Sequence, residues 1–149
     1  MKYLCLLALA ACLIPILGGD SAADPPVALD PKLERALLSA TRDAAREGIT
    51  IRVTSGVRTR AYQQQLLDEA IKTYGSEAIA RQYVNTPERS THVQGLAVDV
   101  GPTDAAYWMA QHGADYGLCQ IYANEIWHFE RVIRPGGTCP PQKKDASDG

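Results

Sequence analysis

The chain has no excess of basic residues, no CxxC pair and no internal repeat. Lys and Arg number 15 against 17 Asp and Glu, which gives a formal net charge of -2 at pH 7. Nothing in this balance indicates binding to nucleic acid or to an anionic membrane surface. A length of 149 residues suits one domain with a single core, and no second domain is visible. We expect a monomer.

Long hydrophobic runs are also absent, except at the N-terminus. Lys2 precedes an apolar run over residues 3–17, which is followed by small residues at 21–23. The run is short for a membrane span, and the three-part pattern is typical of a secretory signal. We therefore predict a signal peptide over 1–23 and a secreted, periplasmic or cell-wall location. An uncleaved anchor and a lipid on Cys12 stay open as alternatives, and either would bring the protein to the membrane.

The four cysteines divide into two groups. Cys5 and Cys12 lie in the predicted signal, so Cys119 and Cys139 remain in the mature chain. An even pair in an oxidising compartment is a disulfide candidate, with two free buried thiols as the alternative. Metal ligation by these two is not expected, because no CxxC spacing accompanies them.

Helical and strand patterns mix along the chain without the regular spacing of βαβ units, which favours an α+β fold. Helical spacing of apolar residues predicts helices over 31–46, over 60 to about 83 with a break near Gly75, and over 103–112. Alternation predicts strands over 49–54, 95–100 and 125–132. The predicted organisation is a linker over 24–31, a domain over 32–140 and a disordered tail over 141–149.

The strongest chemical signal is the segment 90–99, Ser-Thr-His-Val-Gln-Gly-Leu-Ala-Val-Asp. His92 lies at the end of a loop and Asp99 lies on the strand that follows. Because a strand alternates its faces, Asp99 points away from Val98 and Val100. With the valines in the core, Asp99 would face a cleft, where an unpaired carboxylate is costly and a cation would satisfy it. A turn cap is the plainer alternative for Asp99.

The second signal is Glu125-Ile126-Trp127-His128. The imidazole of His128 can face the same cleft, and Glu125 can reach it from the entry of the strand. Two histidines and one carboxylate leave a tetrahedral position open for water, which is the arrangement of a catalytic zinc site. We predict His92, Asp99 and His128 as ligands of Zn²⁺ and Glu125 as the general base.

Arg58 is the predicted source of positive charge for the oxyanion that develops in peptide hydrolysis. It follows the first predicted strand, where a turn can aim it into the cleft, and a surface ion pair is the alternative. The two tryptophans, Trp108 and Trp127, are predicted to pack in the core.

These blocks resemble those of the zinc D-alanyl-D-alanine carboxypeptidases and dipeptidases of the vancomycin-resistance type, which share a fold with the Hedgehog signalling domain. The family pattern is Ser-Gly-Tyr-Arg-Ser followed by a Gln, then Ser-x-His-x-x-Gly-x-Ala-x-Asp, then Glu-x-Trp-His. Here it falls on residues 55–59 with Gln63, on 90–99 and on 125–128. Val57 replaces the usual aromatic residue and Thr59 replaces the second Ser of the first block.

The resemblance covers residues 51–132 and implies a small antiparallel sheet flanked by helices. The implied site consists of the zinc ligands His92, Asp99 and His128, the base Glu125, the transition-state stabiliser Arg58, and the substrate contacts Ser90 and Gln63. Ser90 as a turn former and Gln63 as a structural hydrogen-bonder stay open.

The resemblance also implies a zinc carboxypeptidase that hydrolyses the terminal D-Ala-D-Ala bond of peptidoglycan stem peptides. One alternative is an L,D- or D,D-endopeptidase of the same fold that cuts within the stem or cross-bridge. The other is a non-catalytic zinc-containing module that binds wall peptides. Glu125 argues against the module, because pure binding has no need of that acid.

Overall fold

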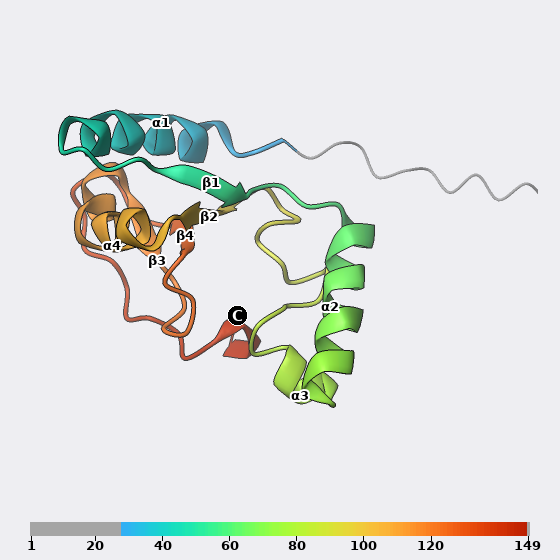
Figure 1. Cartoon of the computed structure of the whole chain (residues 1–149). Helices are drawn as coiled ribbons and strands as arrows, with labels where there is room; N and C mark the ends of the chain where they lie inside the picture. Colours follow the sequence, from blue (N-terminus) through green and yellow to red (C-terminus); the bar gives the residue numbers. More distant parts are fainter. Residues whose placement is uncertain (1–27, 149) are drawn as a thin grey trace, which may run out of the picture.

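The computed structural model describes residues 28–148 and is built around one antiparallel sheet of four strands in the order β1-β2-β4-β3 (Figure 1). The predicted signal peptide and Cys12 lie outside the described residues. The strands are β1 (Arg52–Ser55), β2 (Ala97–Gly101), β3 (Leu118–Gln120) and β4 (His128–Arg131). The helices are α1 (Pro31–Arg46), α2 (Arg60–Tyr74), α3 (Glu77–Ala80) and α4 (Thr103–His112), with short 3-10 turns η1 (Gly113–Tyr116) and η2 (Ala146–Asp148).

Helix α1 has the predicted bounds, and its start is fixed by a side-chain cap. The carboxylate of Asp30 accepts hydrogen bonds from the backbone N–H groups of Lys32 and Leu33, both at 2.9 Å, and Pro31 occupies the first turn. The cap and the apolar stripe together make this helix readable from sequence. The stripe buries Leu33, Ala36, Leu37, Ala40 and Ala44.

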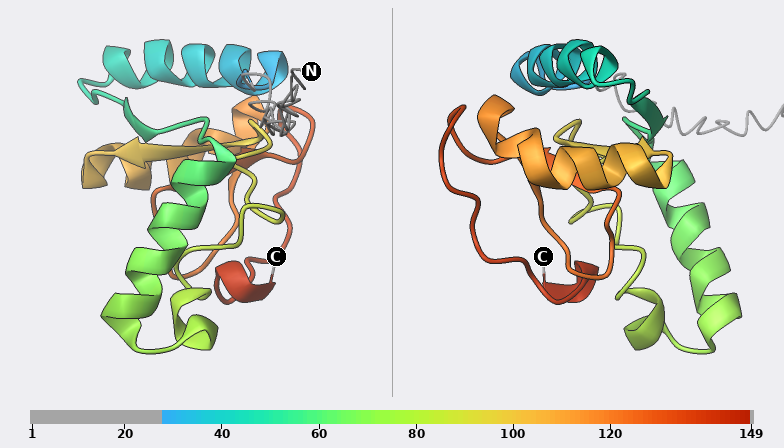
Figure 2. Two further views of the ribbon diagram at one scale, coloured as in Figure 1. Left: turned by 90° about the vertical axis from the view of Figure 1, so that its right-hand side faces the viewer. Right: turned by 60° about the vertical axis from the view of Figure 1, so that its left-hand side comes forward.

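The core lies on one face of the sheet, beneath α1 and α4 (Figure 2). Val98, Val100 and Phe129 point into it and are at most 2% exposed. Trp108 and Met109 of α4 complete this core. The predicted inward orientation of the two valines is confirmed, and the opposite face of β2 and β4 is left for polar side chains.

Helices α2 and α3 stand away from the sheet and form a helical lobe with a small core of their own, Leu67, Ala70 and Ala80 (Figure 1). Helix α2 ends at Gly75, whose φ of 79° is left-handed and suits glycine. The predicted break near Gly75 is therefore confirmed. The chain returns from this lobe to β2 through an irregular segment, as predicted for 85–91.

The strand boundaries differ from the predictions for local reasons. Strand β1 begins only at Arg52, because Ile49 still donates its N–H to the carbonyl of Ala44 at the end of α1. Strand β4 begins at His128 rather than Glu125, because the N–H of His128 closes a turn onto the carbonyl of Glu125 at 3.2 Å. Strand β3 was not predicted, since three residues are too short to show alternation.

The predicted disorder of 141–149 is wrong for the residues up to 148. Lys143 donates its N–H to the carbonyl of Ile121 and accepts from the N–H of Ala123, both at 2.9 Å. Ala146 is buried and is the first residue of η2. The polar composition suggested disorder, but the backbone of this segment finds partners that sequence does not reveal. Within residues 28–148, no helix combines the length and apolarity needed to cross a bilayer.

The predicted disulfide between Cys119 and Cys139 is confirmed. It joins β3 to the chain beyond β4 across a sequence separation of 20 residues. The bridge therefore ties the C-terminal segment to the sheet.

Replacing both cysteines by alanine should lower the free energy of unfolding by about 3 kcal/mol, the value expected from the loop entropy that such a bridge removes. Urea unfolding of the variant measures the loss. The wild-type protein under reducing conditions is the control that separates loss of the cross-link from loss of packing at Cys119. Equal unfolding midpoints for the oxidised and reduced wild-type protein would contradict the expectation.

Candidate metal centre

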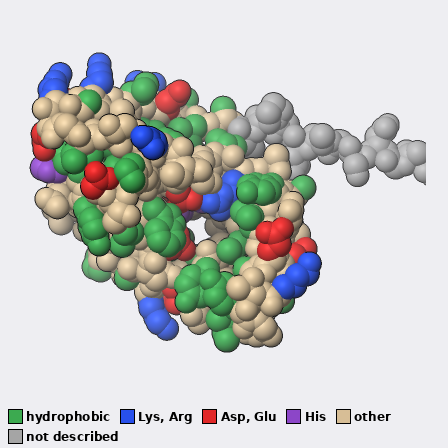
Figure 3. Space-filling view, in the orientation of Figure 1, with side chains coloured by type: hydrophobic (Ala, Val, Ile, Leu, Met, Phe, Trp, Pro, Cys, Tyr) green, Lys and Arg blue, Asp and Glu red, His purple; other side chains and the backbone are tan. Residues whose placement is uncertain are grey.

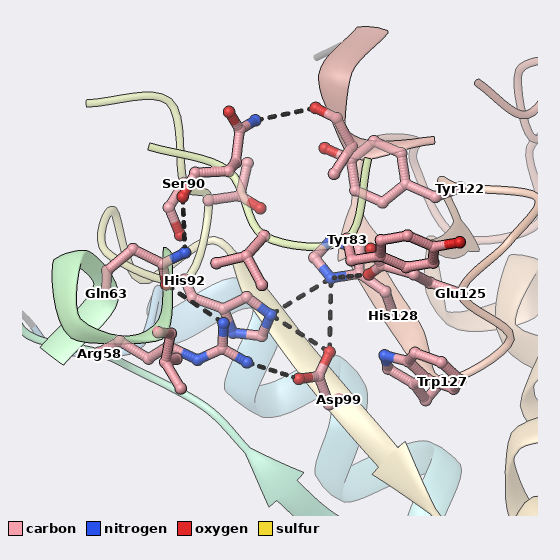
Figure 4. Close-up of a pocket in the computed structure, with 15 residues that line it drawn as sticks. Arg58, Gln63, Tyr83, Ser90, His92, Asp99, Tyr122, Glu125, Trp127 and His128 are labelled. Carbon is pink, nitrogen blue, oxygen red and sulfur yellow. Dashed lines mark hydrogen bonds and ion pairs between the residues drawn. The ribbon is translucent and has the colours of Figure 1, made fainter. Parts of the chain in front are cut away.

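The strand register brings two of the predicted ligands together. Asp99 of β2 and His128 of β4 are direct partners in the antiparallel ladder, so their side chains lie on the same face. His92 reaches this face from a turn that precedes β2, in which Gly95 has a left-handed φ of 73°. One ligand atom from each of the three residues lies within 4.8 Å of the others (Figure 4).

The outer nitrogens of both histidines are held by hydrogen-bond acceptors. Nδ1 of His92 lies 2.8 Å from the carbonyl oxygen of Gly56, and Nε2 of His128 lies 2.9 Å from Oε1 of Glu130. Because these oxygens can only accept, the outer nitrogens carry the hydrogens. The inner nitrogens, Nε2 of His92 and Nδ1 of His128, face each other at 3.2 Å. Two lone pairs of neutral imidazoles would therefore converge on one point.

The carboxylate of Asp99 faces the same point. Its Oδ1 lies 3.2 Å from Nε2 of His92 and 3.4 Å from Nδ1 of His128, yet it is buried and makes no hydrogen bond. Three electron-rich atoms in a buried site repel one another unless a proton or a cation lies between them. The donor set of two imidazoles and one carboxylate fits Zn²⁺.

The ionisation of the site reflects this crowding. Burial opposes the charge on His128, but Asp99 and Glu130 outweigh it and raise the pKa of His128 to about 9. Burial likewise opposes the charge on Asp99, and the two imidazoles overcome it and hold the pKa of Asp99 below its usual range. In the metal-free protein at neutral pH, a proton on His128 thus occupies the place where the three ligand atoms converge.

Glu125 lies beside the three predicted ligands and is not part of their cluster. The turn from Glu125 to His128 sets their side chains next to each other, with Oε2 of Glu125 3.7 Å from Nδ1 of His128. Its other oxygen, Oε1, is buried and makes no hydrogen bond. Burial raises the pKa of Glu125 to about 7, with His128 lowering it and Asp99 raising it. A carboxyl with this pKa can accept and return a proton near neutral pH.

Arg58 lies in the cleft and is not a surface residue. Its guanidinium donates to Oδ2 of Asp99 at 2.8 Å, to the hydroxyl of Ser55 at 2.9 Å and to Oε1 of Gln63 at 3.2 Å. This network fixes the plane of the guanidinium beside the ligand cluster. The structure therefore brings Arg58 to the cleft as predicted, and shows an ion pair with Asp99 that the sequence did not reveal.

Ser90 and Gln63 both line the cleft, with their side chains engaged inside the protein. The hydroxyl of Ser90 accepts from the N–H of Val93 at 3.4 Å, and the amide of Gln63 donates to the carbonyl of Asn85 at 2.9 Å. These bonds agree with the alternative roles, a turn former for Ser90 and a structural hydrogen-bonder for Gln63. Trp108 is buried as predicted.

The prediction that Trp127 packs in the core is wrong, because this side chain is 43% exposed and lines the cleft. It lies within the turn between Glu125 and His128 that precedes β4. Tyr122 also lines the cleft, with its ring centroid 4.9 Å from that of His128. Burial raises the pKa of Tyr122 to about 12. The cleft opens as a hollow between the sheet and the helical lobe (Figure 3) and encloses about 220 Å³.

Glu130 is the residue that sequence reasoning missed. Its Oε1 accepts from Nε2 of His128 at 2.9 Å and from the hydroxyl of Thr91 at 2.9 Å. A carboxylate behind a metal-ligating histidine fixes the tautomer and orientation of the ring and raises the basicity of the ligating nitrogen. The sequence does contain one indication of this role. Glu130 lies two residues beyond His128 on the same strand, so the two side chains share a face.

Comparison with known proteins places this cleft in a family context. The sequence profile of the D-alanyl-D-alanine carboxypeptidases matches residues 26–133. A D-alanyl-D-alanine carboxypeptidase of Enterococcus faecalis (strain ATCC 700802 / V583) is 29% identical over 116 residues, covering 60% of this chain and 43% of the relative. The chain therefore spans less than half the length of this curated relative.

Solved structures share the fold. A mutant of the vancomycin-resistance D,D-pentapeptidase VanY, in complex with Zn(II), superposes with a TM-score of 0.66 at 26% identity, over 70% of this chain and 72% of that one. VanYB in complex with D-alanine-D-alanine gives 0.66 at 25% identity, over 70% and 71%. The L,D-carboxypeptidase LdcB gives 0.63 at 29% identity, over 74% and 69%. The predicted α+β fold with a small antiparallel sheet is confirmed.

We expect Zn²⁺ binding at this centre to release a proton, because the ion needs the lone pair that the raised pKa of His128 keeps protonated. The apparent zinc affinity should therefore rise with pH and level off above about 9. Isothermal titration calorimetry at pH 7.5 in buffers of different ionisation enthalpy measures the released proton. A binding enthalpy that does not depend on the buffer would contradict the expected displacement.

Replacing Glu130 by alanine should weaken zinc binding by about 10- to 100-fold, the usual cost of removing such an outer carboxylate. Glu130→Gln, which keeps an accepting oxygen, should lose less. Competition with a chelator of known affinity measures the dissociation constants, and Glu34→Ala on the exposed side of α1 is the control. An unchanged zinc affinity in Glu130→Ala would show that the contact does not support the ligand.

Proposed function

The chain belongs to the D-alanyl-D-alanine carboxypeptidase family, and we propose that it is a zinc-dependent peptidase that hydrolyses the terminal D-Ala-D-Ala bond of peptidoglycan stem peptides. The observation that carries the proposal is the meeting of three ligand atoms next to a buried acid that has a free oxygen. The printed descriptions of the relatives support the substrate class, since VanYB was solved with D-alanine-D-alanine.

In this proposal His92, Asp99 and His128 hold the zinc ion. A bound Zn²⁺ supplies Lewis acidity, which polarises a peptide carbonyl and makes water acidic enough to act near neutral pH. The chain itself keeps the ligands in place through the carbonyl of Gly56 and the carboxylate of Glu130. These outer contacts leave the inner nitrogens free to bind.

Glu125 is the proposed general base. Its buried carboxyl makes no hydrogen bond through Oε1 and has a pKa near 7 in the metal-free protein, so it can take a proton from water and pass it to the leaving amine. The guanidinium of Arg58, fixed by Ser55 and Gln63, supplies positive charge for the developing oxyanion. Ser90 and Gln63 line the cleft in which the peptide would lie.

The identity of the cleaved bond is a proposal, because the relatives are described as cutting different bonds. VanY is described as a D,D-pentapeptidase, whereas LdcB and the DacB of Streptococcus pneumoniae are described as L,D-carboxypeptidases. The alternatives from the sequence also remain: an endopeptidase that cuts within the stem or cross-bridge, and a module that binds without cutting. The free acid at Glu125 favours catalysis over binding.

We further propose that the protein is exported by its N-terminal segment and acts as a monomer on wall peptides. The disulfide between Cys119 and Cys139 supports an oxidising compartment. Mass spectrometry of the mature N-terminus distinguishes cleavage near residue 24 from retention or lipidation. A mature protein that still begins at Met1 without modification would contradict export through a cleaved signal.

The decisive experiment uses defined stem peptides with the zinc-loaded protein. We expect D-alanine release from a pentapeptide that ends in D-Ala-D-Ala, loss of release with a chelator and recovery on adding zinc. A tetrapeptide stem tests the L,D-bond, and mass spectrometry of all products reveals any internal cut. Release that survives chelation would contradict a zinc mechanism, and intact peptides that nevertheless bind would favour the binding module.

Glu125→Gln should lower kcat by about 10²- to 10⁴-fold, the usual contribution of a general acid–base. The amide keeps the shape of the side chain but cannot take the proton, so zinc stoichiometry should stay unchanged. Glu34→Gln on the exposed side of α1 is the matched control. Full activity of the zinc-loaded Glu125→Gln variant would contradict the role of Glu125 as general base.

A further inference from the structure

The C-terminal segment 142–148 runs from the side of the sheet toward α3 of the helical lobe (Figure 1), and its residue Ala146 lines the cleft. We call it the C-terminal strap. It lies beyond residue 133, where the match to the family profile ends.

On the sheet side, the strap pairs with the loop between β3 and β4. Backbone hydrogen bonds join Lys143 to Ile121 and to Ala123, both at 2.9 Å. Ala146 packs into a small buried cluster with Cys119, Ile121 and Tyr122. Tyr122 lines the cleft, so the strap rests directly behind one of its walls.

On the other side, the strap is bound to the end of the helical lobe. The side-chain amide of Asn85 donates to the carbonyl of Ala146 at 3.0 Å, and the N–H of Ala146 donates to the carbonyl of Gln82 at 3.3 Å. Asn85 is buried, and its backbone carbonyl accepts a hydrogen bond from the side-chain amide of Gln63. Asn124 reinforces the link by donating to Gln82 at 2.9 Å.

These contacts bridge the β3–β4 loop and the helical lobe along one side of the cleft. Ala146 and Asn85 line the same cavity as His92 and Glu125. The cleft has a volume of about 220 Å³, which is small for a ligand pocket.

We propose that the strap determines specificity by limiting the cleft beyond the cleaved bond, so that the site accepts a terminal residue and excludes a chain that continues. The strap thus favours release of a terminal residue over cleavage within a peptide. This inference rests on the proposed function, since it concerns which peptides reach the same centre.

The test compares two peptides, one that ends in D-Ala-D-Ala and the same peptide extended by a C-terminal glycine. We expect the full chain to cut the first and to leave the D-Ala-D-Ala bond of the second intact. A chain that ends at Pro141 keeps the disulfide and lacks the strap. Its preference for the first peptide, measured as the ratio of kcat/KM values, should fall at least tenfold, mainly because the extended peptide is now cut.

A second variant tests the strap within the full chain. Lys143→Pro removes the N–H that bonds Ile121, and Lys143→Ala is its matched control, because it removes the same charge and keeps the N–H. Lys143→Pro, like the truncated chain, should show a lower ratio of kcat/KM for the unextended peptide over the extended one. Lys143→Ala should keep the ratio of the full chain. Circular dichroism and zinc stoichiometry confirm that each variant is folded.

The outcomes separate the two ideas. A full chain that cuts both peptides equally, or a preference that folded variants of both kinds leave unchanged, overturns the role of the strap while the proposed activity stands. A zinc-loaded full chain that cuts neither peptide overturns the proposed function, and the inference falls with it. A lowered preference in the truncated chain and in Lys143→Pro, but not in Lys143→Ala, supports the strap.

Discussion

The pairing of Asp99 with His128 across β2 and β4 is the constraint on which the rest of the structure depends. Alternation along both strands sends Val98 and Phe129 into the core and turns the ligands to the opposite face. A shift of one residue in this register would bury the charged side chains under α1 and expose the core. The hydrophobic core on one face of the sheet thus fixes the positions of Asp99 and His128, two of the proposed metal ligands, on the other face.

Charge balance explains why so many ionisable groups are tolerated in one buried place. Asp99, Glu125 and Glu130 carry three negative charges when ionised, and Arg58 carries one positive charge, which leaves two negative charges. A divalent cation balances this difference. In its absence the site retains protons. Burial raises the pKa of Glu125 to about 7, and Asp99 and Glu130 raise the pKa of His128 to about 9 against the burial that opposes its charge. The buried acids and the proposed cation are therefore parts of one electrostatic unit.

Sequence reasoning could predict the main helices and the convergence of His92, Asp99 and His128 because their signals are local. Asp30 and Pro31 mark the start of α1, Gly75 marks the end of α2, and the alternation around Asp99 reveals its face. The support for the ligands could not be predicted in this way, because Gly56 and Thr91 act through contacts that only the fold creates. The same holds for the ordered segment near Ala146, whose polar sequence conceals backbone partners far away in the chain. The prediction for Trp127 was wrong because its side chain borders the cleft and is 43% exposed, which the apolar character of the residue does not reveal.

Anomalous diffraction at the zinc edge from crystals of the zinc-loaded protein tests the central claim most directly. The account predicts one strong peak, coordinated by Nε2 of His92, Nδ1 of His128 and a carboxylate oxygen of Asp99, with zinc–ligand distances of about 2.0–2.2 Å. It also predicts that Glu125 stays outside the coordination sphere with its carboxylate directed at the open position. A peak at another place, or a site in which Glu125 replaces one of the three ligands, would contradict it.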